Sequence, residues 1–376
     1  MNSVFDEIYK LRKGRPIAID YQNTNRYRIV TKENDGTKTA YCFGVPIYNS
    51  NTRKLVDLKF KNDGKNCYSV GSNADITLSE TAVLRNDVGS CSITFTERIS
   101  AITEKVVCCN NAQITPTVNG LAFKVPCSTD EKIAVKLTTD RPFMDVRANS
   151  KYFALMCEKF KPFVTVSCIG SMGGDGTVVA PCKISFQKIT DTEFSLTLSP
   201  TSPFSKYILY EINLYESKLF QDTTVESMNP KENNAFGTIA FIGNTAAYGE
   251  QWLYSRPDFS LMQDMYSHSV NKAVLHLPRL NNAEVPLSAN KVSSRFCSFG
   301  SKWENKVAIA DKFADADIVS GYHSLDITPL ITEGKSKGLT MSEGMILRTK
   351  IKNSGFTVIA TGDSYYAPQI LEINYK

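Results

Sequence analysis

The chain has 376 residues, of which 42% are hydrophobic and 22% charged, a composition typical of a globular protein with two or three domains. Its net charge of +5 comes from lysines and arginines scattered along the sequence, which argues against a nucleic-acid partner. No stretch approaches the roughly 18 consecutive apolar residues of a transmembrane helix, so we expect no membrane insertion.

The N-terminal segment, residues 1–16, predicts a short amphipathic helix. Val4 and Ile8 fall on one face, and Gly14 and Pro16 end the helix. We expect this segment either to cover the following domain or to dock on a partner. It lacks the basic and apolar regions of a secretory signal, so none is predicted.

Residues 17–218 alternate short strand-like runs with turns. The run 54–60 alternates apolar and polar residues, and 34–37 has the sequence of an Asp-Gly hairpin turn. Such turns recur about every 8–12 residues, which is typical of antiparallel β-sandwiches. We expect either two sandwich domains, 17–110 and 111–218, or one larger domain, because no internal repeat divides the region.

The ten cysteines and three histidines do not form a recognisable metal or disulfide motif. Cys91 and Cys168 lie in strand-like runs, where a free cysteine packs as a small hydrophobic residue. Because no secretory signal and no Cys-x-x-Cys pair is present, we expect reduced core thiols. His268, His276 and His323 lack the usual spacing of zinc ligands, and His276 is interpreted as a surface or half-buried strand residue.

The C-terminal runs 345–350 and 370–375 predict two strands around a turn-rich loop, 361–368. In the last run the even-numbered residues face one way and the odd-numbered residues the other. A terminal strand is normally paired in a sheet, because otherwise it would fray. The last strand is therefore expected to close a β-sandwich.

Several features follow one another in residues 222–376. They are the run 222–225, a Pro–Asn–Gly stretch from Pro230 to Gly243, the alternating run 270–277, a central tryptophan (Trp303) and the Asp-Ile-Thr element within 322–330. In this order they resemble the DNRLRE family of β-sandwich modules, which is related to carbohydrate-binding modules. The literal DNRLRE string is absent, and residues 331–334 stand where the family commonly has a tryptophan. The resemblance implies a jelly-roll-like sandwich that binds a saccharide.

Saccharide binding uses exposed aromatic rings that stack on the sugar, together with polar groups for its hydroxyls. The candidates are Tyr365 and Tyr366 in the C-terminal loop, and Trp252 and Tyr254 in an alternating run. We expect one of the two loop tyrosines to be exposed, because adjacent residues of an extended segment point oppositely. Trp303 and Tyr248 are further aromatic residues, and Trp303 is interpreted as a core residue.

Asp311, Asp315 and Asp317 are weak candidates for calcium ligands. The run lacks the glycine and the terminal glutamate of an EF-hand, so a solvated loop or helix face is the preferred interpretation and no cofactor is predicted. No Ser–His–Asp or Cys–His arrangement stands out. Glu304 and Asp326 are not placed by the sequence at the separation that glycoside hydrolysis requires, so no catalytic residue is predicted.

The sequence thus predicts a mostly β, multi-domain protein of antiparallel sandwiches that recognises a ligand without enzymatic activity. The leading hypothesis is a bacteriophage tail, baseplate or fibre component, assembled in the host cytoplasm and carried on the virion. It would be a homo-oligomer within a larger assembly, with residues 222–376 facing a cell-surface polysaccharide. The first alternative is a bacterial surface adhesin or carbohydrate-binding protein that is exported non-classically. The second is a polysaccharide-degrading enzyme with an accessory module.

Overall fold

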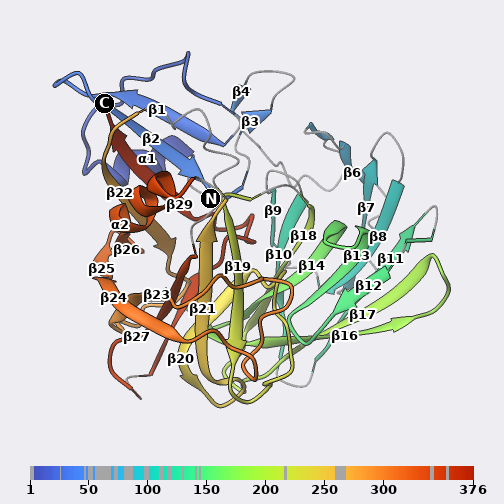
Figure 1. Cartoon of the computed structure of the whole chain (residues 1–376). Helices are drawn as coiled ribbons and strands as arrows, with labels where there is room; N and C mark the ends of the chain where they lie inside the picture. The colour runs from blue at the N-terminus through green and yellow to red at the C-terminus, as the bar shows by residue number, and fades with distance from the viewer. Residues whose placement is uncertain are drawn as a thin grey trace. The chain divides into compact units, whose positions relative to one another are not determined.

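The computed structural model of the chain divides into two compact units (Figure 1). We call residues 1–50 with 216–376 the split unit, and residues 51–215 the inserted unit. Antiparallel strands dominate both units, as the sequence predicted. The structure describes residues 4–25, 27–45, 48–49, 54–55, 69–71, 75–79, 88–96, 101–109, 113–116, 120–128, 131–139, 142–143, 145–215, 218–258, 268–338, 343–352 and 355–376.

The split unit contains two antiparallel sheets. The first sheet has the strand order β1 (Arg28–Lys32), β2 (Lys38–Phe43), β29 (Ile370–Tyr375), β22 (Val270–Pro278), β26 (Tyr322–Asp326) and β25 (Asp317–Val319). The second sheet has the order β24 (Ile309–Asp315), β23 (Leu287–Val292), β27 (Met345–Thr349), β21 (Gly249–Pro257), β20 (Ile239–Thr245) and β28 (Phe356–Ala360), with β19 (Phe220–Glu226) also paired to β21. A short helix, α2 (Thr328–Ser336), follows β26.

The two sheets of the split unit enclose one apolar core. Leu371 and Ile373 of the last strand lie fully buried in this core beside residues such as Leu253 of β21. Glu372 and Asn374, which alternate with them, are only partly buried. The alternation predicted for the final strand is therefore confirmed, and it defines which face of β29 belongs to the core.

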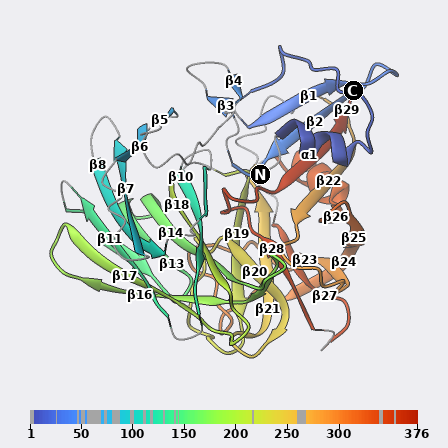
Figure 2. The ribbon, with the colours of Figure 1, turned by 180° about the vertical axis from the view of Figure 1, so that it is seen from behind.

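The N-terminal helix, α1 (Val4–Leu11), packs on the first sheet (Figures 1 and 2). Ile8 is completely buried, and the Tyr322 hydroxyl of β26 donates a hydrogen bond to Glu7 Oε2 at 2.6 Å. Just beyond the helix, Arg12 forms an ion pair with Glu33 at 2.6 Å. These contacts fasten the N-terminal segment to strands from both ends of the sequence.

The observed division of the chain differs from the predicted domain boundaries. Residues 17–110 were expected to form a domain, but β1 and β2 belong to the same unit as residues 216–376. β2 pairs with β29 along its whole length, with Lys38 opposite Tyr375 and Phe43 opposite Ile370. Strand pairing joins backbone groups regardless of their separation in the sequence, so the local rhythm of strands and turns cannot identify such a partner.

The inserted unit also contains two antiparallel sheets, visible on the left of Figure 2. One has the order β12 (Asp145–Ala148), β13 (Tyr152–Glu158), β14 (Lys161–Met172), β18 (Tyr207–Leu214), β10 (Gly120–Pro126) and β9 (Gln113–Pro116), with β15 (Val178–Ala180) paired to β14. The other has the order β16 (Cys182–Lys188), β17 (Glu193–Pro200), β11 (Ile133–Thr139), β8 (Ala101–Cys109), β7 (Val88–Thr96), β6 (Asp75–Ser79) and β5 (Ser69–Gly71). Two short strands, β3 (Tyr48–Asn49) and β4 (Lys54–Leu55), form a separate two-stranded sheet.

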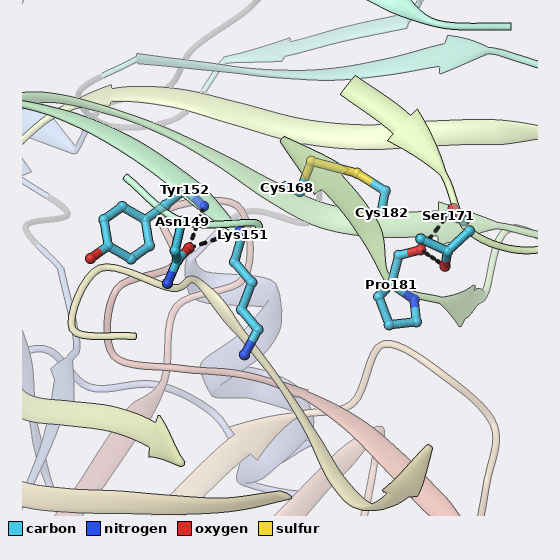
Figure 3. The surroundings of a disulfide bond; sticks show 8 residues. Asn149, Lys151, Tyr152, Cys168, Ser171, Pro181 and Cys182 are labelled. Carbon is cyan, nitrogen blue, oxygen red and sulfur yellow. Dashed lines mark hydrogen bonds between the residues drawn. A yellow bond between two sulfur atoms is a disulfide. The ribbon is translucent and has the colours of Figure 1, made fainter. Parts of the chain in front are cut away.

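A disulfide joins Cys168 of β14 to Cys182 of β16 inside the inserted unit (Figure 3). Both cysteines are buried in the core, and their Cα atoms are 6.1 Å apart, within the usual range for a disulfide. Close to them the Ser171 hydroxyl donates a hydrogen bond to the Pro181 carbonyl at 3.2 Å. The expectation of reduced thiols is therefore wrong for this pair. The two cysteines meet because β14 and β16 face each other from different sheets, which sequence spacing does not reveal.

The chain leaves and re-enters the split unit at adjoining points. Gly44, shortly after β2, accepts a hydrogen bond from the Leu219 amide at 3.1 Å, just before β19. The Gly44 amide donates in turn to the Gln369 carbonyl at 2.8 Å, in the loop before β29. The chain therefore leaves and re-enters the split unit next to the C-terminal loop, residues 361–368.

Candidate ligand-binding site

β21 carries a row of long side chains on the outer face of the second sheet. Leu253 faces the core of the split unit, so Trp252, Tyr254 and Arg256, which alternate with it, point to the other face. These outward residues are nevertheless nearly inaccessible, with exposed fractions of 9%, 0% and 7% respectively. Another part of the chain must therefore cover them.

The cover is residues 293–308, which we call the covering loop. Its ends are joined by a hydrogen bond from the Ser293 amide to the Ala308 carbonyl at 3.0 Å. Near its C-terminal end the Tyr254 hydroxyl donates to the Val307 carbonyl at 2.8 Å, which fixes the loop to β21. A loop whose ends are joined and fixed to the sheet presents its side chains in defined positions.

Aromatic rings fill the space between the covering loop and β21. Phe296 packs on Tyr254 with ring centroids 5.4 Å apart, and Trp303 packs on Trp252 at 4.9 Å with the rings tilted by 51°. Trp303 was interpreted as a core residue of a central strand, but it lies in a turn and is only partly buried. Trp303 is therefore the aromatic residue of this cluster that reaches the surface.

Polar groups surround the two tryptophans. The Trp252 indole N–H donates a hydrogen bond to Glu250 Oε1 at 2.9 Å. The exposed Lys306 places its ammonium 4.4 Å from the centroid of Trp303 and 5.9 Å from that of Trp252. The corner formed by Trp252, Trp303, Glu250 and Lys306 thus combines an aromatic surface with one acidic and one basic group.

Arg256 lies at the other end of the row on β21. Burial, followed by repulsion from Arg295, lowers the pKa of Arg256, and Asp258 partly opposes this shift. Arg256 Nη2 donates to Gln221 Oε1, but Nε has no hydrogen-bond partner among the described residues. Arg256 was not among the predicted contacts, although it continues the two-residue period of Trp252 and Tyr254, and this period was the available signal.

The C-terminal tyrosine loop, residues 361–368, is held in place by buried contacts. Tyr365 is only 2% exposed, and the Lys218 ammonium lies 5.8 Å from its ring centroid. The same ammonium forms a buried ion pair with Asp363, while Tyr366 is partly buried. Of the four predicted ligand contacts, Tyr254 and Tyr365 are therefore inaccessible as they lie, and Trp252 is nearly so. Tyr254 is sealed by the covering loop and Tyr365 by its packing against the lysine.

Asp222 of β19 lies near this loop. It is 2% exposed; one carboxyl oxygen accepts a hydrogen bond from the Gly362 amide, and the other has no partner among the described residues. Burial raises the pKa of Asp222 to about 7, against the opposing effects of the Gly362 amide and the Lys218 charge. Asp222 is thus a buried carboxyl group that changes its charge near neutral pH.

The three aspartates considered for calcium lie on strands, not on a loop or a helix. Asp311 and Asp315 belong to β24 and Asp317 to β25. Asp315 Oδ2 is engaged by Lys312 at 3.1 Å and by Lys350 at 3.0 Å, which lowers the pKa of its carboxyl group. Across the described ranges, no three His, Cys, Asp or Glu side chains are arranged to hold a metal ion.

His276 joins three neighbouring strands of the first sheet. Its Nδ1 lies 2.8 Å from Ser324 Oγ on β26, and its Nε2 lies 3.2 Å from Glu372 Oε2 on β29. The set resembles a nucleophile–base–acid arrangement. However, Ser324 sits mid-sheet, paired with His276 on one side and Asp317 on the other, so its backbone is committed to the sheet and offers no oxyanion site. We interpret the set as a structural network.

Comparisons with known proteins leave the chain without a family. No family model matches it, and no curated protein matches it either, so the resemblance to DNRLRE modules stays a prediction. None of the helices in the described part of the chain has the length and apolarity needed to cross a membrane.

Among solved structures, the chain is similar to heparan sulfate lyase HepC from Pedobacter heparinus, at 6% identity over 65% of this chain and 42% of that one, with a TM-score of 0.20. A mutant of the same lyase gives 7% identity, 67% and 43% coverage, and a TM-score of 0.20. The chain thus spans less than half the length of these structures. A similarity this low does not bear on fold or function.

Proposed function

We propose that the protein is a non-enzymatic recognition protein whose split unit binds a saccharide at the corner formed by Trp252, Trp303, Glu250 and Lys306. The observation that carries this proposal is the placement of Trp303, which reaches the surface beside Trp252. Aromatic rings with a few polar groups at their edges are the usual means of holding a sugar ring. Lys306 is exposed, so moving its ammonium off the Trp303 ring costs only about 0.5–1 kcal/mol.

The proposal moves the predicted contact away from the C-terminal tyrosine loop. A ligand at Tyr365 would have to displace the buried pair of Lys218 and Asp363, which would leave a charge without its partner. A ligand at Trp303 displaces only an exposed lysine side chain. The free-energy cost for a ligand to reach the aromatic ring is therefore lower at the tryptophan corner than at Tyr365.

Two classes of protein fit a saccharide-binding function of this kind. The first is a bacteriophage tail, baseplate or fibre component that assembles with other subunits; the second is a bacterial surface adhesin or carbohydrate-binding protein. The disulfide between Cys168 and Cys182 fits either one, because disulfides persist on virion surfaces as well as on cell surfaces. Mass spectrometry of purified virions and of cell-surface fractions distinguishes the two classes.

The binding test is a glycan array followed by calorimetry on the full chain. Trp303→Ala is expected to weaken binding about tenfold or more, because it removes the stacking surface, and Trp303→Phe should retain part of it. Tyr21→Ala serves as the matched control, since Tyr21 is a highly exposed aromatic residue elsewhere in the split unit. Absence of binding across the array, or wild-type affinity in both Trp303 variants, would overturn the proposal. Release of reducing sugar from any bound polysaccharide would overturn its non-enzymatic part.

A further inference from the structure

The two tryptophan rings of the corner hold an ammonium group of the chain itself. Lys306 Nζ lies 4.4 Å from the centroid of Trp303 and 5.9 Å from that of Trp252. It also donates a hydrogen bond to the Trp303 carbonyl at 3.4 Å. The face of an indole ring carries partial negative charge and attracts cations more strongly than other aromatic rings do. Two such rings and a carbonyl oxygen therefore lie around one ammonium group.

A carboxylate lies at the edge of the same rings. Glu250 is half-buried, and its Oε1 accepts the hydrogen bond from the Trp252 indole N–H at 2.9 Å. In the described part of the chain Glu250 forms no ion pair, whereas Glu304 of the covering loop lies 3.9 Å from the ammonium of Lys302. The corner thus holds a carboxylate at a fixed position whose charge no cation of these residues offsets. A cationic ligand would supply that charge.

The position of Trp303 is set by the backbone around it and not by the lysine. Asn233 Nδ2 donates hydrogen bonds to the carbonyls of Ser298 and Ser301, at 2.6 and 2.9 Å. The backbone amide that follows Trp303 donates to the Pro230 carbonyl at 3.1 Å. The covering loop is therefore held on both sides of the ring. A ligand can replace the exposed lysine while both rings stay in place, and such preorganised contacts lower the entropic cost of binding.

We infer that the ligand of the tryptophan corner is a saccharide that carries an ammonium group, as an amino sugar does, and that this group takes the place of the Lys306 ammonium at the two rings. The inference rests on the proposed function and names its ligand class. The sugar ring extends from that position over Trp303, the more exposed of the two rings. Lys306 moves into solvent, and Glu250 offsets the charge of the ligand.

The first test uses a simple probe on the full chain. Choline and its neutral analogue, in which carbon replaces the nitrogen, have the same shape and differ in charge. The chain has 2 tryptophans and both belong to the corner, so their fluorescence reports on this site. Choline is expected to bind about tenfold more tightly than the neutral analogue. Trp303→Leu keeps an apolar side chain but removes the aromatic ring, so it should abolish this preference.

The second test uses saccharides. Oligosaccharides of glucosamine are titrated by calorimetry beside their N-acetylated forms, which have no ammonium group, and the free-amine forms should bind about tenfold more tightly. Lys306→Gln should raise the affinity for the free-amine forms about threefold, because the ligand no longer competes with the lysine for the rings. Lys272→Gln is the control, because it removes the same charge from an exposed site on β22 and should change nothing.

The outcomes separate this inference from the proposed function. Saccharide binding that requires Trp303 but is equal for free-amine and N-acetylated forms overturns the inference and leaves saccharide recognition standing. A preference for free amines that survives Trp303→Leu shows attraction to carboxylates elsewhere on the surface, and it also overturns the inference. No binding to any saccharide overturns both, even where choline binds.

Discussion

Replacing Asp222 by asparagine should stabilise the split unit, by an amount that grows with pH. The carboxyl group is buried and one of its oxygens has no partner among the described residues, so its charged form is costly in the folded state. Asparagine keeps an oxygen that can accept the Gly362 hydrogen bond, but it cannot ionise. The substitution therefore removes the cost of the charge and keeps the contact.

The magnitude follows from the pKa. Burial raises the pKa of Asp222 from 3.8 to about 7, so the folded protein holds the proton that the unfolded chain releases above pH 4. The contribution of Asp222 to stability is complete below the unfolded pKa and is lost as the pH rises to about 7. At about 1.4 kcal/mol per pKa unit, a shift of about 3 units corresponds to ~4 kcal/mol. The asparagine variant should match the wild type near pH 4 and exceed it by up to about 4 kcal/mol at pH 8.

The assay is urea unfolding followed by tryptophan fluorescence at several pH values between 4.5 and 8. The chain has 2 tryptophans, Trp252 and Trp303, and both belong to the split unit, so the signal follows this unit alone. Asp35→Asn is the control, because the pKa of the exposed Asp35, in the turn between β1 and β2, is lowered by its bonds to Thr37, so its charge does not change within this pH range and the variant should differ from wild type by a constant amount. An Asp222→Asn variant that is less stable at every pH, or differs by a constant amount, would refute the reasoning.

Two further predictions concern the backbone and the disulfide. The double variant Cys168→Ala with Cys182→Ala should lower the free energy of unfolding of the inserted unit by about 3 kcal/mol, for a closed loop with a sequence separation of 14. Calorimetry should show the same loss of stability in the wild-type protein after the disulfide is reduced. The reductant should have no effect on the double variant. A wild-type protein whose stability does not change with reductant would contradict the prediction. Gly243→Ala should destabilise the split unit by about 3 kcal/mol, since at φ +127 its Cβ would lie 2.1 Å from a backbone carbonyl oxygen of the facing segment. Gly36→Ala, at φ +82 with no atom within 4 Å, should cost only about 1–2 kcal/mol in the same urea titration, and equal losses would show that the close approach is not the cause.

The structure of a segment was predictable where neighbouring residues in the sequence determine it. The hairpin turn at 34–37 joins β1 to β2, and the alternation in 370–375 identifies the core face of β29. Both depend on residues within a few positions of each other. The β2–β29 pair was not predictable, because its strands are more than 300 residues apart in the sequence and backbone pairing leaves no side-chain signature.

The candidate site was predictable in its residues but not in its arrangement. Trp252 was a predicted contact and Trp303 a further aromatic residue, yet nothing in the sequence indicates that a loop folds back to bring the two ring centroids within 4.9 Å. The burial of Tyr365 depends on Lys218, which is far away in the sequence. Such contacts require the folded chain, and they decide which aromatic residue a ligand can reach.

The junction at Gly44 has a consequence for the order of events during synthesis. β1 and β2 are made before the inserted unit, but β29, the partner of β2, is made more than 300 residues later. At about 5–20 residues per second that interval is roughly 15–65 s. An isolated two-stranded hairpin is only marginally stable in water, so the edge of β2 must wait without its partner for that time. The inserted unit, continuous in sequence, can fold first, and β29 then pairs with a strand that was made before that unit.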